Sequence, residues 1–240
     1  MIKEHAFNSI WWRGRAGILE EPTFFELPEA ERLAELESYE WVEFRCPLAA
    51  APDPWRIRRA GFVWADAQIG FRIALPAVPE YPESAALPAR FADTEPFEVP
   101  AADLPAFPHE RFLLIPGATP ERVTARYALW AKTLLSHSPE WCVALGMPDA
   151  PQGWFLAERD GERLHLALAM LHRNASISGH YLYAKALKVF AERGARLGYA
   201  RFSIRNSPVH NVYTRLGAVF RETAGVWLWA GGRLEDTNPF

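Results

Sequence analysis

The second half of the chain alternates hydrophobic and polar residues with clear helix and strand periods. A helix is predicted to begin at Thr119 and Pro120, which suit the N-cap and the first turn. Its apolar residues recur on one face: Val123, Tyr127, Trp130 and Leu134. The stretch 153–171 predicts a hairpin that turns at Asp160-Gly161, because alternating apolar runs flank that dipeptide.

An irregular stretch, "HRNASISGHY", leads from this hairpin into a second predicted helix that ends near Gly194 or Gly198. Its apolar positions are Leu182, Ala186, Val189 and Phe190. The strand "YARFSI" follows, and then a short helix capped by Asn206 or Ser207, with Gly217 free to take a left-handed closing conformation. The last pattern, "AVFRETAGVWLWA", predicts a final hairpin.

The first half has a weaker pattern, which predicts a helix over 28–38, a strand in "YEWVEFRC", a short helix over 54–60 and an extended stretch over 62–75. Eight prolines then occur within 33 residues, from Pro76 to Pro108. Such a segment holds neither a continuous helix nor a central strand. We therefore predict two domains, 1–95 and 96–240, with a proline-rich linker from about residue 76.

Composition narrows the class of protein further. Half of the residues are apolar, the formal net charge is -3, and the densest basic stretch is Arg56 to Arg59, which argues against nucleic-acid binding. Cys46 and Cys142 have neither metal-like nor disulfide-like spacing. Residues 1–9 lack the apolar core of a signal peptide and no apolar run could span a bilayer, so we expect a cytoplasmic protein without a membrane partner.

The order of elements predicts an α/β fold with a mixed, largely antiparallel central sheet. A polar loop that joins a strand to the start of a helix suits a phosphate-bearing ligand, because the first-turn amides are free and the helix dipole is positive there. The stretch "MLHRNASISGHYL" is therefore the first candidate for a binding site.

Two motifs carry a resemblance to a known family. "NSPVHNVYTRLGAVF", residues 206–220, resembles the late signature "N-x-x-A-x-x-L-Y-x-x-x-G-F" of the GNAT superfamily, the acetyl-CoA-dependent N-acyltransferases. "ERFLLIPGATPERVTARYALWAKTL" and "AGFVWADAQIGF" resemble segments of the branch that acetylates nucleotide-linked amino sugars, such as dTDP-fucosamine acetyltransferase. The resemblance covers most of the chain, most strongly over 110–229.

The resemblance implies the chemistry of the site. Tyr213 corresponds to the tyrosine that protonates the departing CoA thiolate, and Asn206 to the asparagine that helps to hold acetyl-CoA. A phenol can serve as such an acid if it lies within hydrogen-bond reach of the sulfur. The remaining residues implied to bind acetyl-CoA through the strand end and loop are Met170, Leu171, His172, Ser176, Ile177, Ser178, Gly179 and His180.

The loop departs from the superfamily's pattern "Q/R-x-x-G-x-G/A" for the pyrophosphate. Its positions fall on Asn174, Ile177 and Gly179, or on Ser176, Gly179 and Tyr181 after a shift of two residues, and either alignment supplies a single glycine. Only backbone amides are strictly required for phosphate binding, so the loop could still form a polar cradle. The departure also keeps an alternative open, a catalytically inactive GNAT-fold protein that serves in binding or assembly.

An internal similarity between two segments of the chain suggests that the first half is a truncated GNAT-like repeat. "WVEFRC…RRAGFVWADAQIGFRI" and "ARFSIRN…TRLGAVFRETAGVWLW" share a strand, a short helix, a glycine and a long extension. We expect this half to shape the acceptor pocket or to extend the sheet rather than to bind acetyl-CoA.

Several residues have structural interpretations beside the functional ones. Tyr213 can be a core residue, Asn206 a simple helix cap and Cys142 a buried strand residue, and the histidines do not have a metal-ligand pattern. Candidates for the base that deprotonates the amine are Glu140, Glu158 and His172. The sequence thus predicts an acetyl-CoA-dependent N-acetyltransferase without a metal, acting on a primary amine of a small acceptor. It leaves open whether the protein forms a homodimer.

Overall fold

A single ten-stranded sheet runs through the whole molecule in the computed structural model, which describes residues 1–231 and 234. The strand order is β1-β2-β3-β10-β4-β9-β8-β7-β6-β5. Only β2 with β3 and β8 with β9 are parallel neighbours, and the other pairs are antiparallel. The prediction of an α/β fold with a mixed, largely antiparallel sheet is confirmed.

The second half contains the elements that its hydrophobic periods predict. Thr119 caps the first helix by accepting from Arg122 N, and Gly217 closes the last helix with φ 84°. The elements are α5 (Pro120–His137), β6 (Cys142–Met147), β7 (Ala150–Asp160), β8 (Arg163–Leu171), α6 (Gly179–Glu192), β9 (Leu197–Ser203), α7 (Ser207–Arg215) and β10 (Val219–Trp229).

The first half contains the predicted elements and an additional strand, helix and strand at its start. These elements are β1 (Lys3–Glu4), α1 (Ala6–Trp12), β2 (Ala16–Leu19), α2 (Glu29–Leu36), β3 (Trp41–Pro47), α3 (Pro54–Arg59) and β4 (Val63–Ala74). No helix within the described residues is long and apolar enough to cross a membrane.

The proline-rich stretch forms only short elements, α4 (Pro82–Ala85), β5 (Ala89–Phe91) and 3₁₀ turns. β5 is the outermost strand of the sheet, which is where a proline-rich neighbourhood is tolerated. The predicted domain boundary near residue 95 follows β5, while the sheet continues through both halves. The end of the second predicted domain, 232–233 and 235–240, lies outside the described residues.

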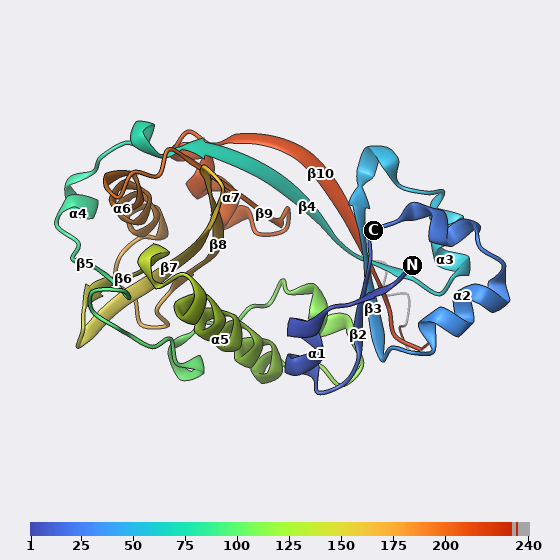
Figure 1. Ribbon diagram of the computed structural model, residues 1–240. Coiled ribbons are helices and arrows are strands. Elements are labelled where there is room, and N and C mark those ends of the chain that lie inside the picture. The colour runs from blue at the N-terminus through green and yellow to red at the C-terminus, as the bar shows by residue number, and fades with distance from the viewer. Residues whose placement is uncertain (232–233, 235–240) are drawn as a thin grey trace.

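The final hairpin was a wrong prediction, because residues 219–229 form the single strand β10. β10 pairs with β3 on one side and with β4 on the other, so it lies within the sheet of the first half. "ETAG" falls at an irregularity in the pairing with β4, between Phe220 and Thr223, and not at a reversal of the chain. Figure 1 shows β4 and β10 side by side as one long arc that joins the two halves.

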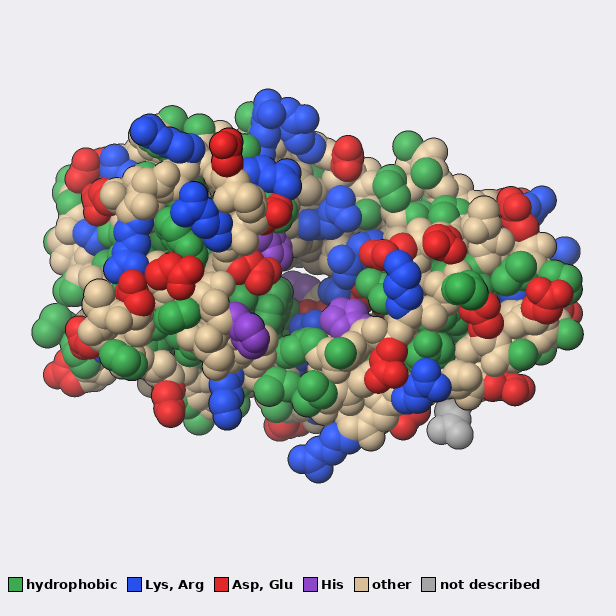
Figure 2. Space-filling view, viewed as in Figure 1, with side chains coloured by type: hydrophobic (Ala, Val, Ile, Leu, Met, Phe, Trp, Pro, Cys, Tyr) green, Lys and Arg blue, Asp and Glu red, His purple; other side chains and the backbone are tan. Residues whose placement is uncertain are grey.

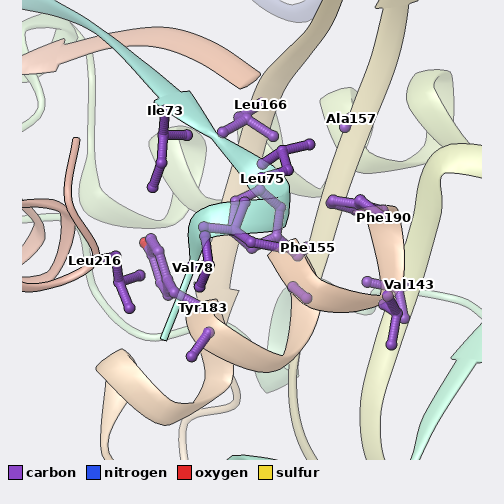
Figure 3. Packing of buried hydrophobic residues seen from close by; sticks show 14 of the residues in the cluster. Ile73, Leu75, Val78, Val143, Phe155, Ala157, Leu166, Tyr183, Phe190 and Leu216 are labelled. Carbon is purple, nitrogen blue, oxygen red and sulfur yellow. The ribbon is translucent and has the colours of Figure 1, made fainter. Parts of the chain in front are cut away.

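The helices cover both faces of this sheet. α6 and α7 pack on one face against residues such as Phe71, Phe155 and Leu166, and α2 and α3 extend this layer over β3 and β10. α1 and α5 pack on the opposite face. Figure 3 shows part of the core under α6, which includes Phe155 of β7 and Phe190 of α6. The ring centroids of these two residues are 5.6 Å apart.

The two halves share an order of elements. β3, α3 and β4 follow one another as β9, α7 and β10 do, which is the order on which the repeat hypothesis is based. In addition, α2 connects the parallel pair β2 and β3, as α6 connects the parallel pair β8 and β9. The correspondence between the two halves therefore extends further toward the N-terminus than the similarity between the two sequence segments.

Phe190 provides a test of this packing, because its side chain is fully buried between α6 and the sheet. We expect Phe190→Ala to lower the free energy of unfolding by about 3–5 kcal/mol, through lost contacts and a residual cavity. The measurement is urea unfolding followed by circular dichroism. Trp55→Ala is the control, since Trp55 is 68% exposed, and it should change stability by less than about 0.5 kcal/mol. Equal effects of the two substitutions would contradict the assigned core.

Candidate active site

Strands β8 and β9 stop pairing partway along their length. We call the gap between their unpaired inner edges the opening. Their parallel pairing covers only three positions and stops at His165 and Tyr199, although β8 continues to Leu171 and β9 to Ser203. The outer edges of both strands stay paired, β8 with β7 and β9 with β4. The opening is therefore a wedge with fixed walls.

A β-bulge in β8 lies where the opening begins. Between the pairs Leu156–Leu168 and Glu158–His165, two steps of β7 face three steps of β8, so β8 has one extra residue. Before the bulge, Leu166 packs on the α6 side, and after it Leu168 packs on the α5 side. The bulge thus reverses the side-chain alternation and turns β8 away from β9.

Backbone groups of β8 line the opening. The amide of His172 donates to Gln152 O at 2.9 Å, and is therefore already paired with the segment leading into β7. Because donors alternate along a strand, Met170 also directs its peptide groups to β7, whereas those of Ala169 and Leu171 point into the opening. Of the three predicted amides at this strand end, the one of Leu171 faces the opening.

The loop after β8 forms a cradle around one oxygen atom. Gln152 Oε1 accepts from Ser176 N at 2.9 Å, from Ser176 Oγ at 3.2 Å and from Ile177 N at 3.2 Å. Three donors that converge on one acceptor are the arrangement that a phosphate oxygen needs. In this conformation a carboxamide of the protein itself holds that position.

Three further residues of the predicted loop start helix α6. No hydrogen bond is made by the amides of Ser178, Gly179 or His180 among the described residues, as expected for the positive end of a helix. Gly179 is open to approach, because an added Cβ would meet only Leu171 Cδ1 at 3.7 Å. The His180 ring packs edge-on against Tyr81 with centroids 4.9 Å apart.

Asn206 and Tyr213 lie on α7, beside the β9 wall of the opening. Asn206 Oδ1 accepts from Val209 N at 3.3 Å and so caps the helix. Tyr213 is 3% exposed and packs between Phe71, Phe202 and Tyr183, with ring centroids 3.9, 6.0 and 5.4 Å away. Burial raises the pKa of Tyr213 well above its usual value, so its phenol stays protonated, and within the described residues that phenol makes no hydrogen bond.

A cluster of ionised side chains lies on the opposite face of the sheet. Glu43 on β3 accepts from Arg111 Nε at 2.7 Å and from Arg45, and Arg111 also contacts Glu110 at 3.2 Å. Burial favours a higher pKa for Glu43, but the charges of Arg111 and Arg45 outweigh it and lower the pKa to about 2. Figure 2 shows a hollow under the arc of β4 and β10, with basic, acidic and histidine side chains at its walls.

Asp66 is the residue of this face that sequence reasoning missed. It is 2% exposed on β4, and its Oδ1 accepts from Ser203 Oγ at 2.7 Å, at the end of the β9 wall. Burial raises the pKa of Asp66, with the Ser203 hydrogen bond acting against it. The signal in the sequence was a carboxylate inside the largely apolar run "VWADAQIGF".

Each of the three predicted base candidates has contacts of its own. Glu158 binds His165 Nδ1 at 2.9 Å where β8 and β9 are still paired, and Glu140 lies in a 3₁₀ turn before β6. His172 Nδ1 accepts from Asn174 N at 3.0 Å, and its Nε2 lies 3.7 Å from Asp103 Oδ1. Asp66, by contrast, contacts the end of the β9 wall directly through its bond to Ser203.

Comparison with known proteins agrees with this architecture at the level of fold. No family model and no curated protein matches the sequence. The chain is similar to a conserved protein of unknown function from Staphylococcus epidermidis, with TM-score 0.57, 12% identity and coverage of 90% of this chain and 84% of that one. It is also similar to the GCN5-related glucosamine N-acetyltransferase region of a fungal multi-domain GH3 β-N-acetylglucosaminidase, with TM-score 0.51, 9% identity and coverage of 80% and 26%.

A GCN5-related N-acetyltransferase from Sphaerobacter thermophilus is a third similar structure, with TM-score 0.47 and 17% identity. The match covers 83% of this chain and 63% of that one, so the chain spans less than two thirds of that protein's length. The fold of the chain is that of the GCN5-related N-acetyltransferases.

The Glu43 cluster leads to a prediction about acid stability. Because the folded-state pKa is lowered to about 2, Glu43 stabilises the protein above pH 4.5 and loses this contribution as the pH falls from there toward 2. Glu43→Gln should cost about 3 kcal/mol at pH 7, since it leaves Arg111 and Arg45 without their buried partner. The measurement is urea unfolding of both proteins between pH 7 and 3.

The control is Glu95→Gln, which removes an exposed partner of Arg90 and should change stability by less than about 1 kcal/mol at either pH. The difference between wild type and Glu43→Gln should shrink as the pH falls. A difference that stays constant down to pH 3 would show that the charge of Glu43 does not carry the effect.

Proposed function

We propose that the protein transfers an acetyl group from acetyl-CoA to a primary amine of a small acceptor. The observation that carries this proposal is the wedge between β8 and β9, which opens at a bulge and leads directly to the amides that start α6. A strand edge with unpaired peptide groups suits an extended, amide-bearing chain such as pantetheine, and the helix start suits its pyrophosphate.

The residues around the wedge fit the acetyl-CoA substrate in part. The amides of Ser178, Gly179 and His180 are open, and Gly179 has no side chain to obstruct a phosphate. The cradle of Ser176 and Ile177 is shaped for an oxygen, and Gln152 would have to withdraw from it when a phosphate binds. Asn206 would contribute from the start of α7.

The reaction needs an amine that is free to attack. We assign the base to Asp66, because burial raises its pKa and so increases its affinity for a proton. The amine nitrogen forms a bond to the thioester carbonyl carbon while the Leu171 amide stabilises the oxygen, and the C–S bond then breaks. Asp66 takes the proton that the amine nitrogen loses, and Tyr213 gives its proton to the departing thiolate. Exchange with solvent after product release then removes the proton from Asp66 and returns one to Tyr213.

The two assigned groups approach the wedge from opposite faces. Consecutive residues of a strand point to opposite sides, so Phe202 contacts Tyr213 while Ser203 contacts Asp66. A thioester held in the wedge would therefore have its leaving sulfur on the α7 side and its attacking amine on the α5 side. The first half would build the amine's pocket, and its resemblance to the nucleotide-linked amino sugar branch makes such a sugar our proposed acceptor.

A second candidate function is a GNAT-fold protein that binds or assembles without catalysis. The observation that favours it is the Gln152 carboxamide, which satisfies the loop amides that a pyrophosphate would otherwise use. The two functions differ in a single measurable property, the affinity for acetyl-CoA.

Calorimetric titration of the full chain with acetyl-CoA separates the two. The enzyme should bind it with a dissociation constant well below 1 mM, the range of a typical cosubstrate. Absence of binding at about 1 mM acetyl-CoA would end the proposal of catalysis and leave the binding function.

Tyr213→Phe tests the assigned acid. Turnover should fall roughly 100-fold while the affinity for acetyl-CoA stays unchanged, because only the proton donor is lost. Stability should also be preserved, since the phenol has no hydrogen bond within the described residues. The measurement is release of free CoA thiol over time.

Tyr183→Phe is the matched control for this substitution. Tyr183 is also buried, and its ring meets that of Tyr213 edge-on at 5.4 Å, but it lies on α6. Its turnover should match that of the wild type. If both variants keep full turnover, Tyr213 is a core residue and not the acid.

A further inference from the structure

Two arginines lie on the face of the sheet that carries the Glu43 cluster, which we call the hollow face. Both have donors that no carboxylate satisfies. Arg45 on β3 gives one terminal nitrogen to Glu43, but its Nε is buried without a hydrogen-bond partner among the described residues. Arg201 on β9 has no ion pair in the described part of the chain, and its Nε lies close above Gly70, 3.8 Å from where a Cβ would stand. Arg201 is an exposed residue, and desolvation together with the charge of Arg45 lowers its pKa, while the charge of Glu222 acts in the opposite direction.

Gln68 lies on the same face between these two residues. The ladder aligns Arg45 with Val226 and Asp66, then Gln68 with Ser203, and Gly70 with Arg201. Gln68 is 6% exposed, yet its carboxamide has no hydrogen-bond partner within the described residues. The carboxamide atoms of Gln68 are not among the fully enclosed atoms that lack a partner, so a ligand in the hollow can reach them.

The acids nearby do not bind the free donors directly. The charge of Glu222 reaches Arg201, but the two side chains form no ion pair in the described part of the chain. Glu43 is shared by Arg45 and Arg111, and Glu110 is shared by Arg111 and Tyr127. Asp66 accepts from Ser203, and its raised pKa makes it a weaker source of negative charge. His5 faces this cluster, and burial lowers its pKa against the charge of Glu43, which favours the neutral ring.

We propose that Arg45, Gln68 and Arg201 form a subsite for an anionic group, a carboxylate or a phosphate, on the acceptor amine. This inference rests on the proposed acetyl transfer, and it narrows the acceptor to amines that carry a negative charge at a distance from the nitrogen. The two guanidinium groups and the carboxamide bind the anion, and the amine is directed to Asp66 on the neighbouring row of the sheet.

Two matched pairs of probes test the subsite by isothermal titration to the full chain. Glucosamine 6-phosphate is compared with glucosamine, and 4-aminobutyrate with n-butylamine. The charged member of at least one pair should bind at least about tenfold more tightly than its neutral partner. The pair with the larger difference identifies phosphate or carboxylate as the anion.

Arg201→Gln should remove this preference by lowering the affinity for the charged probe about tenfold, and leave the neutral probe unchanged. Gln68→Leu should also lower the affinity for the charged probe. Arg56→Gln removes the same charge from α3 on the opposite face and should have no effect. Arg201→Gln should unfold at the wild-type temperature, because Arg201 makes no ion pair within the described residues.

The outcomes separate this inference from the proposed function. Equal binding of charged and neutral probes, no binding of either charged probe at about 10 mM, or an unchanged preference in Arg201→Gln would overturn the subsite. In that case, turnover of neutral amines with acetyl-CoA would still support the proposed acetyl transfer. Charge-dependent binding that follows Arg201 without any release of CoA would support the subsite and refute acetyl transfer.

Discussion

The exchange of β4 and β10 between the halves is the constraint on which the rest of the structure depends. β10 comes from the end of the chain and lies between β3 and β4, while β4 comes from the first half and lies between β10 and β9. Both are long interior strands, so each satisfies its backbone on both edges only through the other half. The hollow face and its charged residues are consequences of this arrangement.

The wedge is stable because its two walls depend on different neighbours. β8 is held by β7 and β9 by β4, so their separation leaves only the inner edges without partners. The bulge in β8 makes that separation a fixed property of the backbone. By contrast, β2 and β3 pair over all four residues of β2, so the corresponding place in the first half is closed.

The sequence predicts the elements that signal themselves locally. α5 and α7 have caps, a proline in the first turn and an apolar stripe, so their bounds agree with the prediction. The stretch of β10 was predicted as a hairpin, and its pairing with β3 and β4 makes it one continuous strand. Tertiary pairing here overrides the local preference.

The candidate site also has parts that local sequence signals predict and parts that depend on tertiary pairing. Tyr213, Asn206 and the loop before α6 are consecutive motifs, and resemblance could find them. The bulge depends on how β8 pairs with β7, and the contact of Asp66 with Ser203 joins residues 137 positions apart. Gln152 was overlooked for the same reason, since it enters the loop from another strand.

The position of β10 also matters during synthesis. The first half leaves the ribosome with β3 and β4 separated, because the strand that belongs between them is residues 219–229. Its sheet remains incomplete until residues 219–229 have been made, and contacts of such sequence separation form slowly. The nascent first half, with the backbone groups along one edge of each of two strands unpaired, is therefore the stage at which this protein depends most on protection from aggregation.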